Sequence, residues 1–300
     1  MKELEGIFIP MGTPFRNQEI ALEQLKENVE KLNQTGISGY MPLGTNGEFK
    51  SLSDEESLEV IETVNKARSE EKILMAGTGR ESVKETIKFT EKAAEKGIDY
   101  AVVLTPHYFA RLLTEKALIE FFTEVAAASP VPVLLYSAPG YASGVKVTKN
   151  VVKEVAEHPN IAGMKDTTPS DMINYLIAAR DTDNFKVLAG SISNLYTGVT
   201  LGAAGGTISM ANYLPDLCAK LFNLIRDKNN KVTRELYLEL YNLNKAISSR
   251  YGVAGVKTAM DIMGYNGGSP RKPVKKLEEN AVKEIETKLK QTLKIVEEYI

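Results

Sequence analysis

Short apolar or β-rich runs alternate with longer stretches of helical period along most of the chain. This alternation is typical of βαβ units, which build a parallel sheet. Between the short runs, apolar residues recur at i, i+3 and i+4 with charged residues on the opposite face, which predicts amphipathic helices. The predicted strands are residues 6–10, 39–42, 73–76, 100–104, 131–136, 161–164, 186–189 and 206–209. The clearest predicted helices are 22–35, 54–69, 83–96 and 115–128.

The residues at the helix ends agree with these assignments. Ser53 followed by Glu56 forms a capping-box pattern at the start of helix 54–69. Gly36 and Gly97 stand where a glycine is expected to end a helix.

The number of repeated units predicts how the sheet closes. Eight successive βα units fit a (β/α)8 barrel, a fold of roughly 250 residues. A doubly wound open sheet is the alternative, and it favours a G-x-G-x-x-G turn after the first strand. The segment 10–14 instead reads Pro-Met-Gly-Thr-Pro. We therefore predict an α/β protein with a closed TIM barrel.

More helical segments follow the eighth predicted strand than one closing helix requires. They are 216–227, 231–249, 253–263 and 278–300. We interpret them as an appended C-terminal helical bundle, with the barrel at 1–225 and the helical extension at 226–300.

The overall composition narrows the function classes. With 43% hydrophobic and 25% charged residues, the 300-residue chain is typical of a soluble globular protein with a sizeable core. A net charge of -2 gives no reason to expect nucleic acid or an anionic membrane as a partner, since both select a basic face. No apolar run approaches the length that crosses a bilayer. A small molecule or another subunit is the expected partner.

The few cysteines and histidines bear on location and on metal chemistry. Cys218 is the only cysteine, so no intrachain disulfide can form, and this together with the absence of a signal-like start favours the reducing cytoplasm. His107 and His158 are the only histidines, which leaves few nitrogen or sulfur ligands for a catalytic zinc. We expect neither a metal nor another cofactor.

Lys165 is the strongest candidate for chemistry. It follows the apolar run 161–164, so its amine stands at the end of a predicted buried strand. Removal from water favours the neutral amine and lowers its pKa, and a neutral amine attacks a ketone carbonyl to form a Schiff base. The alternative is a lysine that has left the strand and points into solvent, as most lysines near strand ends do.

Polar residues follow several of the other predicted strands. In a (β/α)8 barrel the active site lies at the C-terminal ends of the strands, so these residues are expected to meet. They belong to the segments 44–48 (Gly-Thr-Asn-Gly-Glu), 105–108 (Thr-Pro-His-Tyr), 136–140 (Tyr-Ser-Ala-Pro-Gly), 165–168 (Lys-Asp-Thr-Thr) and 190–191 (Gly-Ser). One amine therefore faces several hydroxyl groups.

Two of these segments suggest specific roles. The glycines of the turn 44–48 let the backbone approach a ligand, and Thr45 and Asn46 offer hydrogen bonds to an anion such as a carboxylate. An ordinary βα turn is the alternative. The phenol of Tyr136 can exchange a proton with the substrate if it lies within reach of Lys165, and a buried structural tyrosine is the competing interpretation.

These residues resemble those of the dihydrodipicolinate synthase and N-acetylneuraminate lyase family of class I pyruvate aldolases. The resemblance runs from 6–10 (Gly-Ile-Phe-Ile-Pro) to 270–273 (Pro-Arg-Lys-Pro). Its most specific elements are the turn 44–48, Tyr136 and the segment 163–166 (Gly-Met-Lys-Asp). The resemblance implies a barrel with C-terminal helices, usually assembled as a homotetramer of two tight dimers.

The resemblance also implies site roles. Lys165 would form the Schiff base with pyruvate, and Tyr136 would relay protons. Thr45 and Asn46 would hold the pyruvyl carboxylate. Tyr108 matches the tyrosine that reaches into a neighbouring subunit's site. The further substrate contacts that we expect are Gly47, Thr167, Gly190, Ser191 and Ile208.

Membership of such a family does not settle the substrate. Dihydrodipicolinate synthases carry an arginine after the tyrosine of strand five, but the segment 136–144 has none and looks one residue longer. Sialic acid lyases carry an acidic pair after the glycine that follows strand seven, where this chain has Ser191 and Ile192. The segments 187–191, 201–206 and 257–261 look most like the 4-hydroxy-2-oxoglutarate aldolase branch, while the longer segment is shared with some deoxy-sugar-acid aldolases.

Our hypothesis is therefore reversible cleavage of a 2-oxo-4-hydroxy acid into pyruvate and an aldehyde. 4-Hydroxy-2-oxoglutarate or a 2-keto-3-deoxy sugar acid is favoured over 4-hydroxy-tetrahydrodipicolinate synthase or N-acetylneuraminate lyase activity. Two interpretations from other classes stay open, a metal-dependent enzyme on the same barrel and a non-catalytic keto-acid sensor.

Overall fold

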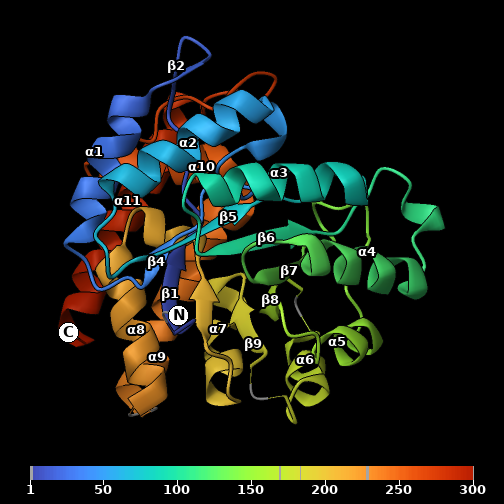
Figure 1. The fold of residues 1–300 in the computed structure, drawn as a ribbon. Coiled ribbons are helices and arrows are strands. Elements are labelled where there is room, and N and C mark those ends of the chain that lie inside the picture. Colours follow the sequence, from blue (N-terminus) through green and yellow to red (C-terminus); the bar gives the residue numbers. More distant parts are fainter. Residues whose placement is uncertain (1–2, 169, 183, 228–229, 300) are drawn as a thin grey trace.

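The computed structural model describes residues 3–168, 170–182, 184–227 and 230–299. Within these residues, eight parallel strands close into a barrel in which β1 pairs with both β4 and β10 (Figure 1). The predicted (β/α)8 barrel is thus confirmed. Its strands are β1 (Gly6–Ile9), β4 (Gly39–Tyr40), β5 (Ile73–Gly77), β6 (Tyr100–Leu104), β7 (Val133–Ser137), β8 (Ile161–Asp166), β9 (Lys186–Ala189) and β10 (Gly205–Thr207).

Helices alternate with the strands and pack around the outside of the barrel (Figure 1). They are α1 (Leu22–Asn33), α2 (Asp54–Ala67), α3 (Val83–Glu95), α4 (Glu115–Ala128), α5 (Lys149–Val155), α6 (Met172–Ala178), α7 (Ile192–Thr200) and α8 (Pro215–Asp227). A small antiparallel hairpin of β2 (Phe15–Arg16) and β3 (Glu19–Ile20) lies between β1 and α1, and the sequence pattern did not predict it.

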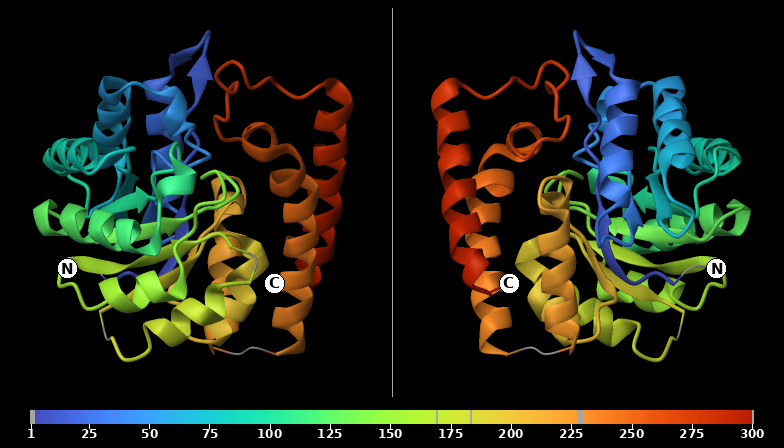
Figure 2. Two further views of the ribbon diagram at one scale, coloured as in Figure 1. Left: turned by 90° about the vertical axis from the view of Figure 1, so that its right-hand side faces the viewer. Right: turned by 90° about the vertical axis from the view of Figure 1, so that its left-hand side faces the viewer.

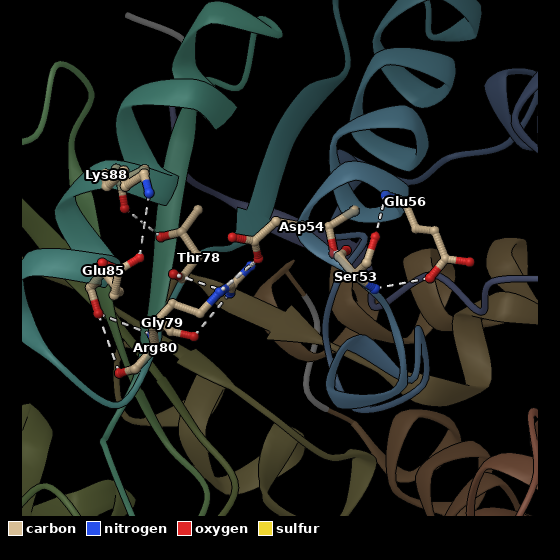
Figure 3. Close-up of polar contacts among 11 residues, drawn as sticks. Ser53, Asp54, Glu56, Thr78, Gly79, Arg80, Glu85 and Lys88 are labelled. Atoms are coloured by element: carbon tan, nitrogen blue, oxygen red, sulfur yellow. Dashed lines mark hydrogen bonds and ion pairs between the residues drawn. The ribbon is translucent and has the colours of Figure 1, made fainter.

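The N-terminus of α2 carries the capping box that its sequence predicts. Ser53 Oγ accepts a hydrogen bond from Glu56 N, and Glu56 Oε2 accepts one from Ser53 N (Figure 3). Beside it, the guanidinium of Arg80 pairs with Asp54 Oδ1 at 2.7 Å. These contacts satisfy the first amides of the helix and tie it to the loop that follows β5.

Several predicted strand boundaries are wrong by one or two residues. β4 is two residues long, and β7 begins at Val133 rather than at residue 131. β8 continues to Asp166, so Lys165 lies inside the strand and not after it. β10 ends at Thr207, so Ile208 follows the strand. Hydrogen bonds to the neighbouring strands define where each strand ends, and the apolar pattern of a single segment does not predict those bonds.

Apolar side chains form two separate cores. One fills the barrel interior, and the other lies between the strands and the surrounding helices. In β7, Leu134 and Tyr136 belong to the interior core while Val133 and Leu135 belong to the outer one. This alternation is the period-two pattern of a strand that is buried on both faces.

A β-bulge in β8 reverses this alternation just before the candidate nucleophile. The register between β7 and β8 shifts where Val133 pairs with Ile161 and Leu134 with Gly163. As a result Ile161 and Met164, three residues apart, both pack in the outer core. A regular strand would have kept Lys165 on the same face as Ile161. The bulge therefore turns Lys165 toward the barrel interior.

Helices beyond α8 stand to one side of the barrel (Figure 2). α9 packs against α7 and α8, and α11 packs against α9 and α10. α10 is kinked at Gly252, whose φ of 55° is not helical. The elements are α9 (Lys231–Asn244), the π-helical turn η4 (Lys245–Ser249), α10 (Arg250–Ile262) and α11 (Glu279–Val296). The predicted C-terminal helices are present, and the division of the chain into domains at residue 225 stays a prediction.

Among the described helices, none combines the length and the apolar character that a membrane-spanning helix needs.

The bulge gives a first prediction. Gly163 has a φ of +151°, and a Cβ atom at this position would lie 2.0 Å from Lys186 O, a backbone atom that cannot move aside. We expect Gly163→Ala to lower the free energy of unfolding by about 2–5 kcal/mol in denaturant titrations. Gly140→Ala is the matched control, because nothing lies within 4 Å of the added methyl group. Equal stability of the two variants would contradict this account of the bulge.

Candidate active site

A cavity of about 220 Å³ lies at the C-terminal ends of the barrel strands. Its walls come from the loops after β4, β8 and β9, from the strands β7 and β8, and from the C-terminal helices. The predicted site residues that line it are Thr45, Asn46, Tyr136, Lys165, Thr167, Gly190 and Ser191. Closure of the barrel thus brings together side chains that lie far apart in the sequence.

Lys165 projects from β8 into this cavity, and only 3% of its surface is exposed. Its Nζ atom lies 3.6 Å from Met41 Sδ and 4.4 Å from the centroid of the Tyr136 ring. No carboxylate of the described chain pairs with it, and burial lowers the pKa of the amine to about 7. A large fraction of this amine is therefore neutral and nucleophilic near neutral pH.

Tyr136 is the neighbour of Lys165 in the β7–β8 register. Its phenolic oxygen lies 3.3 Å from Thr45 Oγ1, within hydrogen-bond distance. Burial raises the pKa of Tyr136 to about 12, and the hydrogen bond with Thr45 offsets part of that rise. The phenol is therefore protonated at neutral pH and can pass a proton only along hydrogen bonds.

The turn 44–48 is held by a hydrogen bond within its own backbone and by one from the side chain of Thr13. Gly47 N donates to Gly44 O at 3.1 Å, and Thr13 Oγ1 donates to Gly47 O at 2.9 Å. Asn46 Nδ2 donates to Ser209 Oγ at 2.8 Å. The side chains of Thr45 and Asn46 remain at the cavity wall.

Glu48 ends this turn in a left-handed conformation, with a φ of 54°. Its Oε1 atom lies 2.5 Å from Nζ of Lys257, a residue of α10 that is only 1% exposed. Its Oε2 atom accepts a hydrogen bond from Arg271 N at 2.8 Å. The strained end of the turn is therefore held by a buried ion pair from the C-terminal helices.

Arg271 extends this attachment. Its guanidinium forms a bidentate pair with Glu56, with Nη1–Oε2 at 2.8 Å and Nη2–Oε1 at 2.6 Å. It also donates to Ser51 O and to Gln18 O. One arginine beyond α10 thus ties the capping box of α2 to the β2–β3 hairpin.

Asn194 in α7 links the loop after β9 to the end of β8. Its side-chain oxygen accepts from Ser191 N at 3.2 Å, and its Nδ2 donates to Asp166 O at 3.1 Å and to Thr168 O at 3.4 Å. The sequence pattern did not predict this residue. Its only sequence signal is the spacing of a cap residue at Ser191 and an amide three residues later.

Asp166 follows the candidate nucleophile and is fully buried. Its Oδ1 atom accepts from Thr168 N and Thr168 Oγ1. Burial raises the pKa of this carboxyl to about 6, and the two hydrogen bonds from Thr168 offset part of the rise. Asp166 therefore titrates in a range where exposed carboxyls are already ionised.

The structure leaves some predicted residues outside the cavity. Gly47 and Ile208 are buried and do not line it. Tyr108 is 79% exposed, and its backbone N–H donates to Glu81 Oε2, so it does not reach the site of its own chain. Gly47 is constrained because a Cβ atom there would lie 3.0 Å from Met11 O.

Other lining residues were missed by sequence reasoning. They are Ser209, Tyr141, Asn244, Ser248 and Ser249, together with Pro10, Gly252 and Val256. Three of the polar ones belong to α9 and η4, whose packing over the barrel depends on contacts distant in sequence. No local sequence motif predicts that residues of these helices line the cavity.

Groups suited to metal or thiol chemistry are not gathered here. Among the described residues, no three side chains of His, Cys, Asp or Glu are arranged to hold a metal ion. Cys218 is buried in α8, and burial raises the pKa of its thiol. His107 lies beside Glu81, with Nδ1 3.1 Å from Oε1.

Comparisons with known proteins agree on one family. The chain matches the model described as the dihydrodipicolinate synthetase family over residues 3–292. It is 34% identical over 271 residues to a 4-hydroxy-tetrahydrodipicolinate synthase of Methanothrix thermoacetophila. This alignment covers 90% of each chain. It is 29% identical to an L-threo-3-deoxy-hexylosonate aldolase of Hypocrea jecorina, with 97% of this chain and 96% of the relative covered.

Solved structures support the same fold. The 4-hydroxy-tetrahydrodipicolinate synthase of Methylacidiphilum fumariolicum SolV superposes with a TM-score of 0.91 and 26% identity. The alignment covers 99% of this chain and 98% of that one.

The buried pair Glu48–Lys257 gives a second prediction. Lys257→Met leaves the Glu48 carboxylate buried without its counter-charge, and we expect it to lower the free energy of unfolding by about 3–5 kcal/mol. The double variant Lys257→Met with Glu48→Gln removes both charges and is expected to recover part of this loss. Chemical denaturation of both variants measures the difference. A double variant that is less stable than the single one would argue against the pair as the anchor of the turn.

Asp166 gives a third prediction, for the pH dependence of stability. Its folded pKa of about 6 is above the value of 3.8 for an unperturbed carboxyl, so the folded state binds the proton more tightly. The stabilising contribution is complete below pH ~3.8 and is lost as the pH rises through ~6. We expect wild type to lose up to about 3 kcal/mol relative to Asp166→Asn between pH 4 and pH 7. Parallel stability curves for the two proteins would exclude this titration.

Proposed function

The chain belongs to the dihydrodipicolinate synthetase family, as its motifs predict, and from that premise we propose that it is a class I pyruvate aldolase. The reaction that we propose is the reversible cleavage of a 2-oxo-4-hydroxy acid into pyruvate and an aldehyde. The observation that carries this proposal is the amine of Lys165, which is buried, lacks a carboxylate partner in the described chain and has a pKa near 7. Few other environments make a lysine nucleophilic at neutral pH.

The chemistry begins at Lys165 Nζ. The neutral amine adds to the C2 carbonyl of the substrate, and loss of water from the carbinolamine gives a protonated imine. The imine then accepts the electron pair of the C3–C4 bond as that bond breaks, while the C4 hydroxyl loses its proton and becomes the aldehyde carbonyl. The resulting enamine takes up a proton at C3, and hydrolysis releases pyruvate and regenerates the lysine.

Tyr136 is the residue that we assign to proton transfer. Its phenol neighbours Lys165 and lies 3.3 Å from Thr45 Oγ1. Because the phenol is protonated at neutral pH, it donates one hydrogen bond while accepting another, as a proton relay requires. Thr45 and Asn46, at the same wall, are the groups that we assign to the pyruvyl carboxylate.

Tyr108 enters the proposal through a second copy of the chain. Together with Phe109 and Leu112 it forms an exposed apolar surface, with exposures of 79%, 64% and 73%. Exposed apolar groups of this size mark interaction surfaces. We propose that this surface pairs two copies within a homotetramer, and that Tyr108 of one copy completes the proton relay of the other.

The aldehyde partner separates several related activities. The segment 136–144 carries no arginine for the carboxylate of aspartate semialdehyde, which disfavours 4-hydroxy-tetrahydrodipicolinate synthase activity. We propose 4-hydroxy-2-oxoglutarate or a 2-keto-3-deoxy sugar acid as the substrate instead, and only the sugar acid leaves an aldehyde half without a second carboxylate. Relatives of both kinds are similar to this chain. N-acetylneuraminate lyase activity and a non-catalytic keto-acid-binding role are the remaining alternatives.

Borohydride trapping tests the proposal directly. Incubation with pyruvate and borohydride is expected to attach one reduced pyruvyl group to Lys165, located by peptide mass spectrometry. Because the pKa of Lys165 is about 7, the trapping rate should rise with pH and level off above that value. Lys165→Ala is expected to abolish the adduct, whereas Lys146→Ala, which changes a lysine paired with Asp171 outside the cavity, should retain it.

The outcomes separate the alternatives. An adduct on another lysine, or none, would overturn the aldolase proposal. An adduct without turnover of any 2-oxo-4-hydroxy acid would favour the keto-acid-binding role. Activity with aspartate semialdehyde alone would overturn the substrate preference and leave the imine chemistry in place.

A further inference from the structure

The cavity around Lys165 has a second wall, which the C-terminal helices supply. Asn244 ends α9, Ser249 ends η4, and Gly252 lies in the first turn of α10. All three line the same cavity as Lys165. None of the chemical steps proposed above uses them.

The backbone of this wall departs from regular helix where it meets the cavity. Residues 245–249 form a π-helical turn, in which hydrogen bonds join residues five apart. In an α-helix, residue 249 would lie about 140° around the axis from residue 244. Here the two side chains meet, and Asn244 Nδ2 donates to Ser249 Oγ at 3.4 Å. The π-turn therefore places an amide and a hydroxyl together on the face toward the cavity.

The charge of the cavity limits what this wall can bind. Lys165 is the only charged side chain among the described residues that line it. In the proposed reaction this charge belongs to the imine at C2. A second carboxylate on the substrate would find hydroxyl and amide groups from this chain but no cation, and buried carboxylates depend on charged partners.

We propose that Asn244 and Ser249 form the subsite for the aldehyde-derived half of the substrate, and that this half is an uncharged, hydroxylated chain. The inference rests on the proposed aldolase function. Ser249 Oγ accepts from Asn244, so its own O–H is left to donate to a substrate hydroxyl. Thr167 and Ser191 line the same cavity and supply further hydroxyl groups. A substrate with several hydroxyls satisfies such a surface because each one both donates and accepts.

The test compares three small aldehydes in condensation with pyruvate: glyceraldehyde, propionaldehyde and glyoxylate. We expect wild type to have the highest kcat/KM with glyceraldehyde. Asn244→Ala and Ser249→Ala should each lower that value about fivefold to tenfold, as the loss of one hydrogen bond predicts, and change the value for propionaldehyde less than about threefold. Asn242→Ala, an exposed asparagine on the same helix, is the matched control and should leave every value unchanged.

Pyruvate trapping on Lys165 serves as the second measurement. It should be equal in wild type and in both variants, which shows that the variants fold and form the imine. A preference of wild type for glyoxylate, or an equal loss with glyceraldehyde and propionaldehyde, would overturn the subsite while the aldolase proposal stands. Absence of the pyruvate adduct in wild type would instead overturn the aldolase proposal, and the subsite with it.

Discussion

The burial of one amine without a counter-charge is the constraint on which the site depends. Lys165 and Lys257 are both almost completely buried, with exposures of 3% and 1%. Lys257 meets Glu48 at 2.5 Å, and this pair opposes the effect of burial on its pKa. The amine of Lys165 lies beside Met41 Sδ and the ring of Tyr136, and no carboxylate in the described part of the chain pairs with it, so the effect of burial on its pKa is not opposed. The same type of side chain is thus an ion-paired anchor at Lys257 and the proposed nucleophile at Lys165, and the presence or absence of a carboxylate partner makes the difference.

Placing that amine inside the barrel requires a local irregularity. Because the β-bulge at Gly163 shifts the alternation of β8 by one residue, Met164 packs outward and Lys165 inward. Bulges are often found beside active sites for this reason. Behind the strand, Asn194 bonds the carbonyl groups of Asp166 and Thr168 and so fixes where β8 ends. The bulge, the candidate nucleophile and the contacts that fix the end of the strand therefore lie within a few residues of one another on β8.

The fold was largely predictable, because strand and helix periods and the capping box at Ser53 are local properties of the sequence. The motif residues at the strand ends were predictable for the related reason that barrel closure collects them at one edge. The bulge was not, since the apolar run 161–164 gives no sign of a register shift. The role of Lys257 was also missed. A lysine on a late helix becomes part of the site only through tertiary packing, which places it against Glu48.

The C-terminal helices consequently do two things at once. Lys257 of α10 and Arg271 of the segment between α10 and α11 hold the turn that carries Thr45 and Asn46, the residues assigned to the constant pyruvyl half of the substrate. Through η4 the C-terminal helices form the wall assigned to the variable half. Substitutions in η4 can therefore change the aldehyde without touching the strand that carries the amine. A fold whose proposed imine chemistry and tail recognition lie on separate elements can keep one reaction while its substrates diverge. This accords with the two relatives named for different activities, a synthase at 34% identity and a sugar-acid aldolase at 29%.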